Sequence, residues 1–315
     1  MTRHFLRDDD LSPAEQAEVL ALAAELKQAR HATLPLAGPQ TVAVVFDKPT
    51  LRTQLSFATG ISELGGYPMV VDGSLARIGT RESVADVARV LGRQAAMVVW
   101  RTFEQSRIDE MAAYAGVPVI NALTDQFHPC QLLADLQTVQ ERLDSLAGRT
   151  MTFLGDAGSN MAHSMLLAGT TAGMHVRVSG PDDNAPDPEV LSRAADIAAT
   201  TGGSARYLVA AAEAVAGADV VATDTWVSMG KEEEADRRLR LFGPYSLDGP
   251  LLALASPDVV VLHCLPAYRG KEIAADVIDG PNSAVWDEAE NRLHAQKALM
   301  TWLLAHQDGP REEER

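Results

Sequence analysis

Short β-branched runs alternate with helical stretches along this chain, and the alternation occurs twice. In the first half the runs lie at residues 41–46, 69–72, 97–100 and 117–120. In the second half they lie at 151–154, 176–179, 207–209, 220–222 and 259–262. Continuous apolar runs of this length are typical of strands buried on both faces of a parallel sheet. The sequence therefore predicts an α/β fold with two doubly wound parallel-sheet domains joined by interdomain helices.

Helix signals place the domain limits. Ser12 offers an N-cap, Pro13 a first helical residue and Glu15 a capping-box partner, so a helix is expected from there to about Arg30. A helix over 129–146, ended by Gly148, is expected to join the domains. We expect domains over 1–146 and 147–285, with a last helix in 286–315 that packs back on the first domain. The highly charged run 230–242 predicts a solvated loop or short helix.

Charge and cysteine content limit the possible partners. The 315 residues carry a formal net charge of −16, and the isoelectric point is near 4.9. This argues against nucleic acid or an anionic membrane surface as a partner, because both select for basic patches. No apolar run approaches the roughly 20 residues that cross a bilayer, and the N-terminus lacks a signal-peptide core. Cys130 and Cys264 fit neither a disulfide framework nor a zinc spacing. We expect a cytoplasmic protein without metal or cofactor.

The segment after the first strand can bind an anion. In open α/β sheets, ligands lie beyond the carboxyl ends of the strands. Thr50 can cap the helix that follows, and the first N–H groups of that helix point at one spot together with Arg52 and Thr53. The segment is not a Walker loop. A well-capped helix with a surface arginine remains an equally good reading of this segment taken alone.

Later strand ends add further candidates. Arg101 follows an apolar run, and His128 and Gln131 begin a helix. The turn from Gly155 to Asn160 lacks the G-x-G-x-x-G spacing, which makes a nucleotide-dependent dehydrogenase improbable. Further side chains at strand or helix ends are Asp224, which suits an ammonium group, the Cys264 thiol and Arg292.

Together these residues indicate group transfer. The first half gathers groups that bind anions, in a protein that is acidic overall. The second half gathers Asn160, Asp224, Ser228 and Cys264, which suit an aminated or zwitterionic ligand. This combination predicts transfer of a group from an anionic donor to an amine acceptor.

Three motifs carry a family resemblance. His128-Pro129-Cys130-Gln131, Asp224-x-Trp226-x-Ser228-Met229-Gly230 and His263-Cys264-Leu265-Pro266 resemble the aspartate/ornithine carbamoyltransferase family, and the likeness runs almost end to end. The S-M-G and H-C-L-P elements are typical of the ornithine branch. The resemblance implies that carbamoyl phosphate and L-ornithine give citrulline and phosphate in arginine biosynthesis, without metal or cofactor. It also implies a homotrimer, or a multiple of trimers, with active sites at subunit boundaries.

The same resemblance assigns roles to residues. It implies that Arg101, His128, Cys264 and Asp224 act in catalysis. Carbamoyl phosphate would be held by Thr50, Leu51 (through its backbone amide), Arg52, Thr53, Arg77, Arg101, His128, Gln131, Arg292 and the main-chain carbonyls of Cys264 and Leu265. Ornithine would be held by Asn160, Asp224, Ser228 and Met229.

Two departures from the family pattern concern the phosphate. Where the family usually has S-T-R-T-R, this chain has Thr50-Leu51-Arg52-Thr53-Gln54, which loses one hydroxyl and one arginine. In the loop 73–82, where the family commonly has a glutamine that reaches a neighbouring subunit's phosphate, this chain has Arg77. We hypothesise that Arg77 compensates in part. The alternatives are a paralogue that carbamoylates another amine and a catalytically silent homologue.

Overall fold

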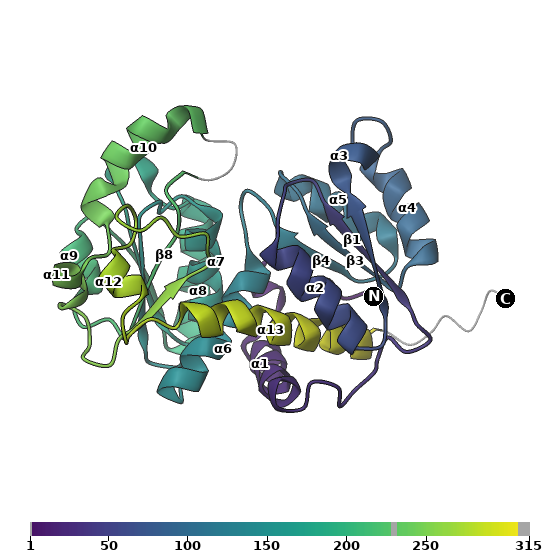
Figure 1. Ribbon diagram of the computed structural model, residues 1–315, viewed down its shortest axis with the longest axis horizontal. Coiled ribbons are helices and arrows are strands. Elements are labelled where there is room, and N and C mark those ends of the chain that lie inside the picture. Colours follow the sequence, from purple (N-terminus) through teal and green to yellow (C-terminus); the bar gives the residue numbers. More distant parts are fainter. Residues whose placement is uncertain (1, 228–231, 308–315) are drawn as a thin grey trace. The chain divides into compact units, whose positions relative to one another are not determined.

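The computed structural model describes residues 2–227 and 232–307, and it divides into two compact units (Figure 1). Unit 1 comprises Met1–Leu133 with Arg292–Arg315, and unit 2 comprises Ala134–Asn291. The chain passes from one unit to the other within α6 (Pro129–Leu143) and within α13 (Val285–Ala305).

Unit 1 contains a four-stranded parallel sheet in the order β2-β1-β3-β4. The strands are β1 (Thr41–Phe46), β2 (Tyr67–Asp72), β3 (Met97–Arg101) and β4 (Val119–Leu123). The helices are α1 (Pro13–Gln28), α2 (Arg52–Glu63), α3 (Gly73–Ala76), α4 (Val84–Gln94) and α5 (Gln105–Ala115). The core lies between β3, α4 and α5 and includes the fully buried Trp100, Ala88 and Met111.

Unit 2 contains a five-stranded parallel sheet in the order β7-β6-β5-β8-β9. The strands are β5 (Thr150–Leu154), β6 (His175–Ser179), β7 (Ser204–Leu208), β8 (Val220–Thr223) and β9 (Val260–His263). The helices are α7 (Asn160–Thr171), α8 (Pro188–Thr201), α9 (Ala211–Val215), α10 (Ala235–Phe242), α11 (Gly249–Leu252) and α12 (Ala275–Ile278). The predicted fold class, with two parallel sheets and surrounding helices, is therefore confirmed.

The first helix follows from its capping residues. The Ser12 hydroxyl accepts from the Glu15 N–H at 3.3 Å, and the Glu15 carboxylate accepts from the Ser12 N–H at 2.8 Å. This is the predicted capping box, and Pro13 is the first helical residue. Residues 12–15 thus fix the start of α1 as expected.

The structure corrects the expected burial of β2. This strand is not buried on both faces, because it lies at the edge of its sheet. Tyr67, Met69 and Val70 are 52%, 46% and 38% exposed. An apolar run alone does not distinguish a central strand from an edge strand that presents apolar side chains.

The charged run 230–242 contains the expected short helix with mostly exposed charged residues, but one of its arginines is not solvated. Residues from Ala235 on form α10, and the Arg238 side chain on this helix is buried. Its guanidinium pairs with the buried Asp156 carboxylate and donates to the Trp226 carbonyl. A buried partner distant in sequence thus overrides the local charge pattern. Within the part of the chain that the structure describes, no helix combines the length and the apolar character needed to cross a membrane.

Candidate active site

In unit 1, the buried Arg292 lies at the centre of a cluster of donors. Its guanidinium donates to the Thr53 hydroxyl at 3.0 Å and to the Gln131 side-chain oxygen at 2.9 Å. Thr53 lies in the first turn of α2, Gln131 in the first turn of α6, and Arg292 on α13. One side chain therefore links three helices of the unit at the residues expected to bind the donor.

Arg101 and His128 complete this cluster. Arg101 is the last residue of β3, where the register against β4 shifts between Trp100 and Arg101, and a bulge of this kind re-aims a side chain. Both side chains are buried, at 8% and 5% exposure. Burial, and then the positive charges of Arg292 and Arg101, hold the pKa of His128 well below its ordinary value of 6.5. His128 is thus a neutral imidazole next to two permanent cations.

The predicted phosphate segment forms the start of α2, but its capping residue differs from the expected one. Thr50 does not cap the helix. Leu51 occupies the N-cap position without a side-chain cap bond, and its side chain is 76% exposed. Arg52 and Thr50 are half-buried. Since the first N–H groups of a helix lack acceptors within it, this turn can bind an anion through its backbone as well as through Thr53.

Arg77 stands apart from the cluster among the described residues. Its side chain is exposed, it follows α3, and its φ of 50° lies in the left-handed region. The Arg77 carbonyl accepts from the Thr80 and Arg81 N–H groups, which form the turn. Among the described residues, the hydrogen bonds of Arg77 are made by its main-chain N–H and carbonyl groups.

A network around Asp47, which the sequence interpretation missed, ties this loop to the sheet. The Asp47 carboxylate accepts from the Thr102 hydroxyl at 2.6 Å and from Arg107 at 3.3 Å. Arg107 also donates to the Ile78 carbonyl at 2.8 Å. A Cβ on Gly73 would lie 2.0 Å from an Asp47 oxygen, so only glycine fits there. The signal was present, because Asp47 directly follows β1.

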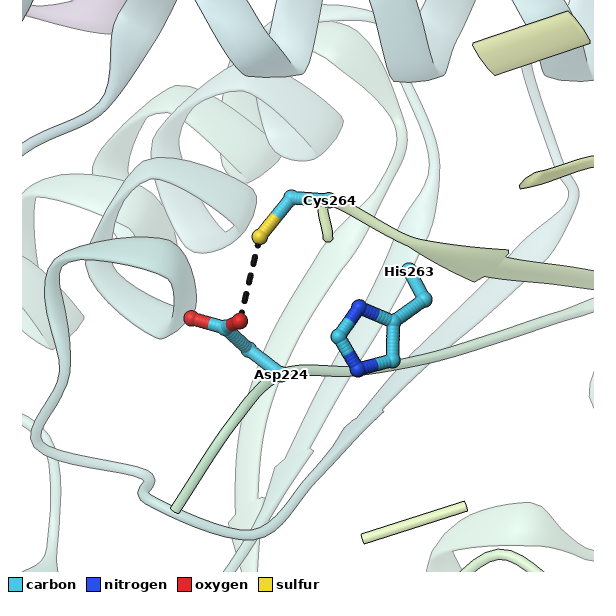
Figure 2. A group of neighbouring side chains, drawn as sticks. All are labelled: Asp224, His263 and Cys264. Carbon is cyan, nitrogen blue, oxygen red and sulfur yellow. Dashed lines mark hydrogen bonds between the residues drawn. The ribbon is translucent and has the colours of Figure 1, made fainter. Parts of the chain in front are cut away.

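In unit 2, the predicted catalytic carboxylate and thiol are hydrogen-bonded to each other. Asp224 follows β8 and Cys264 follows β9, two neighbouring parallel strands whose carboxyl ends share an edge. The Cys264 thiol donates to Asp224 Oδ1 at 3.1 Å, and the Thr225 N–H donates to the same oxygen at 2.7 Å. Figure 2 shows the two side chains turned toward each other with His263 beside them.

Burial sets the protonation of this pair. Burial raises the pKa of Asp224, an effect that the electrostatic interaction with the nearby His263 side chain and the thiol hydrogen bond oppose. Burial, and then the negative charges of Asp224 and Glu288, raise the pKa of the Cys264 thiol well above its ordinary value. Cys264 is therefore a neutral thiol at neutral pH and a poor nucleophile, since the thiolate is the reactive form.

Asp224, His263 and Cys264 also form a group that could hold a metal ion, because their ligand atoms lie within 4.8 Å of one another. Each group already has a hydrogen-bonding role. His263 Nδ1 accepts from the Leu265 N–H, and its Nε2 lies 3.3 Å from Glu272. A metal would have to displace these bonds and take the proton from Cys264, so the donor set fits a hydrogen-bonded network better than a resident ion.

The turn after β5 carries Asn160, the predicted ornithine ligand, as the first and half-buried residue of α7. Nearby, Asp156 accepts from Asn184 and pairs with Arg238, and Arg238 donates to the Trp226 carbonyl. A Cβ on Gly155 would lie 3.0 Å from Trp226 Nε1, so that glycine serves packing. The sequence interpretation missed Asp156 and Arg238. Ser228 and Met229 lie outside the described residues.

Comparisons with known proteins cover almost the whole chain. Residues 3–141 match the family described as "Aspartate/ornithine carbamoyltransferase, carbamoyl-P binding domain". Residues 147–303 match "Aspartate/ornithine carbamoyltransferase, Asp/Orn binding domain".

Individual relatives are similar over nearly their full length. The chain is 62% identical to a protein of Clavibacter sepedonicus named ornithine carbamoyltransferase, covering 96% of this chain and 99% of that one. It is 60% identical to a protein of the same name from Leifsonia xyli subsp. xyli, covering 97% and 98%. The solved ornithine carbamoyltransferase of Pyrococcus furiosus matches with a TM-score of 0.93 at 39% identity, covering 98% of each chain.

Proposed function

Because the chain belongs to the aspartate/ornithine carbamoyltransferase family, we propose that it transfers the carbamoyl group of carbamoyl phosphate to the δ-amine of L-ornithine. The products are L-citrulline and phosphate, and the reaction serves arginine biosynthesis. The observation that carries this assignment is the identity of 60–62% to proteins named ornithine carbamoyltransferase over nearly their full length. The chemistry of both sets of side chains is consistent with it.

The donor is assigned to the cationic cluster of unit 1. The phosphate group is bound by the Leu51 backbone N–H, the α2 N-terminus and a set of side chains: Thr50, Arg52, Thr53, Arg77 and Arg101. The carbamoyl end is bound by His128, Gln131, Arg292 and the main-chain carbonyls of Cys264 and Leu265. The buried guanidinium groups support this assignment, because a charge-assisted hydrogen bond to an anion is roughly twice as strong as a neutral one.

The acceptor is assigned to unit 2. Asn160, Asp224, Ser228 and Met229 bind ornithine, and Cys264 lies next to the reacting δ-amine. The Asp224 carboxylate supports this assignment because it can accept from an ammonium or amine group. Burial removes water from the Asp224 carboxylate and so raises its pKa, and a cationic partner would stabilise its charged form.

In the chemical step the neutral amine attacks the carbamoyl carbon, the C–N bond forms, and the bond to the phosphate oxygen breaks. Negative charge grows on the carbonyl oxygen, where Arg101, His128 and Thr53 donate hydrogen bonds. Such donors contribute about 3–4 kcal/mol each to transition-state stabilisation. The amine proton leaves with the departing phosphate, a base that the reaction itself supplies. The neutral Cys264 thiol donates to Asp224 and forms no covalent intermediate.

Domain roles follow the same division. We assign carbamoyl phosphate binding to residues 1–146, ornithine binding to 147–285, and to 286–315 a helix that returns to the first domain. Within unit 1, α13 contacts α2 through the Lys297–Glu63 ion pair at 2.8 Å and contacts α1 through the bond from Trp302 to Glu18 at 3.0 Å. These contacts support the last assignment.

The assembly is proposed to be a homotrimer, or a multiple of trimers, in the cytoplasm. Exposed apolar side chains on β2 and α2 support a subunit contact on unit 1. Leu51 is 76% exposed, Leu55 63%, Tyr67 52% and Met69 46%. Large exposed apolar side chains on neighbouring elements are a feature of protein–protein contact sites. A contact near the start of α2 would also bring a neighbouring chain close to the phosphate ligands.

The test is a citrulline assay with carbamoyl phosphate and L-ornithine, run beside putrescine, lysine and 2,4-diaminobutyrate. We expect turnover that prefers ornithine. Preference for another amine would retain the mechanism and replace the acceptor. A folded oligomer without turnover on any of these amines would contradict the proposal and favour a silent homologue, for which Leu51 and Gln54 are the only sequence support.

A further inference from the structure

We propose that His263 and Glu272 are a positioning pair that holds the turn after β9, and that they are not proton-transfer groups. This inference rests on the proposed function, because that turn carries Cys264 and the two main-chain carbonyls assigned to the carbamoyl end. Neither residue belongs to the set proposed to bind substrate or to act in catalysis.

The turn has an unusual backbone. Leu265 has a φ of 58°, in the left-handed region that side-chain-bearing residues rarely adopt. Such a conformation persists only where surrounding contacts over-determine it. The Leu265 N–H donates to His263 Nδ1 at 3.0 Å. The ring two residues earlier therefore holds the strained residue directly.

The same bond fixes the tautomer of the ring. A nitrogen that accepts from a backbone N–H carries no proton, so the proton of neutral His263 is on Nε2. Nε2 lies 3.3 Å from Glu272 Oε1, which accepts it. Both side chains are buried, at 0% and 1% exposure. The carboxylate thus orients the ring, and the ring orients the Leu265 backbone.

Glu272 also closes the far side of the turn. Its Oε1 accepts from the Tyr268 N–H, and its main-chain carbonyl accepts from the Leu247 N–H at 2.9 Å. One carboxylate oxygen therefore holds both the ring and the chain four residues before it. The His263 N–H is held in turn by Glu288 at 2.8 Å. The turn is fixed at both ends by buried carboxylates.

The geometry excludes one alternative role. His263 lies beside Asp224 and Cys264 (Figure 2), where a general base for the amine could be expected. Its one lone-pair nitrogen already accepts from Leu265, and its other nitrogen donates to Glu272. The ring therefore has no acceptor left for a substrate proton, and its contribution to the reaction is the shape of the turn.

The test compares Glu272→Leu with Glu272→Gln. Glutamine keeps an oxygen that accepts from both the ring and the Tyr268 N–H, whereas leucine keeps neither bond. In Glu272→Leu we expect kcat to fall about 10- to 100-fold, the size expected when reacting groups are displaced by about 1 Å. Amide hydrogen exchange at Leu265 and Tyr268 should accelerate at least about tenfold as these bonds are lost. Glu272→Gln should keep most of the wild-type kcat and the amide protection at Leu265 and Tyr268.

A second pair of variants tests the role of the ring. Asparagine at 263 keeps an oxygen near the position of Nδ1, so His263→Asn should lose less activity than His263→Leu. Neither variant should change the shape of the pH–rate profile. His163→Leu is the matched control: His163 is buried in the same unit and accepts from the Asp187 N–H at 3.1 Å, away from the turn. This control should lower stability without accelerating exchange at Leu265.

Different outcomes would overturn the proposed function and the positioning role of His263 and Glu272. Wild-type protein that makes no citrulline overturns the proposed function and this inference with it. Active wild type with a Glu272→Leu variant that keeps both its rate and its amide protection overturns the inference alone. Loss of a pH limb in His263→Asn also overturns it, because that result would make the ring a titrating participant.

Discussion

The two sets of functional side chains differ in how they obtain their charge. In unit 1 the charge is permanent: Arg101 and Arg292 are buried guanidinium groups, and burial together with their positive charges keeps His128 neutral. In unit 2 the charge depends on protonation: burial raises the pKa of both Asp224 and Cys264. Under the proposed assignment, the anionic donor binds at a site whose charge does not vary with pH. The amine binds at a site whose protonation can vary with pH. We expect substitutions in unit 1 to affect mainly carbamoyl phosphate, and substitutions in unit 2 to affect mainly ornithine.

The largest effect is expected for Arg101→Leu. This change removes the buried donor that we assign to the developing oxyanion, and kcat should fall by about 10²–10³-fold. Steady-state citrulline formation with both substrates varied measures it. The matched control is Arg107→Leu, which removes a nearby guanidinium that contacts Asp47 and Ile78. A loss of kcat as large in Arg107→Leu as in Arg101→Leu would argue against a specific role for Arg101.

Asp224→Asn should act on the other substrate. The amide cannot offer a carboxylate to the amine, so the KM for ornithine should rise on the order of 100-fold, the scale of a charge-assisted hydrogen bond of about 3 kcal/mol. The KM for carbamoyl phosphate should change little. Initial rates over a matrix of both concentrations give both constants. Equal changes in the KM values for ornithine and carbamoyl phosphate would contradict the assignment of the two substrates to different units.

The pattern of β-branched runs was enough to predict the strands, and strand ends were enough to predict most of the candidate residues. Arg101 ends a strand, and Asp224 and Cys264 each directly follow one, at the sheet edge where parallel topology collects ligands. The sequence pattern could not predict contacts between side chains that are far apart in the chain. Arg238 belongs to a charged run, and only the distant Asp156 explains its burial. No sequence motif singled out Glu272, because its buried contact with His263 depends on how the chain turns after β9.

His128→Gln should change how stability depends on pH. The native pKa of His128 is lowered below 6.5, whereas the unfolded value stays near 6.5, so the unfolded chain binds a proton that the native protein does not. This contribution lowers the stability of the wild type as pH falls below 6.5. Urea unfolding at a series of pH values should show a shallower loss in His128→Gln. Parallel curves for the two proteins would mean that His128 is not held neutral.

The smallest effect is expected for Leu51→Ser. The substitution supplies the hydroxyl that the family usually has, but the Leu51 side chain is 76% exposed and its assigned contact is through the backbone N–H. The KM for carbamoyl phosphate should change by less than about threefold, the size of a net neutral hydrogen bond of roughly 0.5 kcal/mol. Gln54→Arg, made beside it, restores the second missing family residue. A KM for carbamoyl phosphate more than tenfold lower in Leu51→Ser would mean that the altered phosphate loop limits donor binding in this protein.

Direct binding of a donor analogue tests the division between the units most simply. Isothermal titration with phosphonoacetamide, a stable analogue of carbamoyl phosphate, would be run on the wild type, Arg101→Leu and Asp224→Asn without ornithine. We predict that Asp224→Asn binds the analogue like the wild type, and that Arg101→Leu binds it at least about tenfold more weakly, a difference of about 1.4 kcal/mol. Equal loss of affinity in both variants, or loss in Asp224→Asn alone, would contradict it.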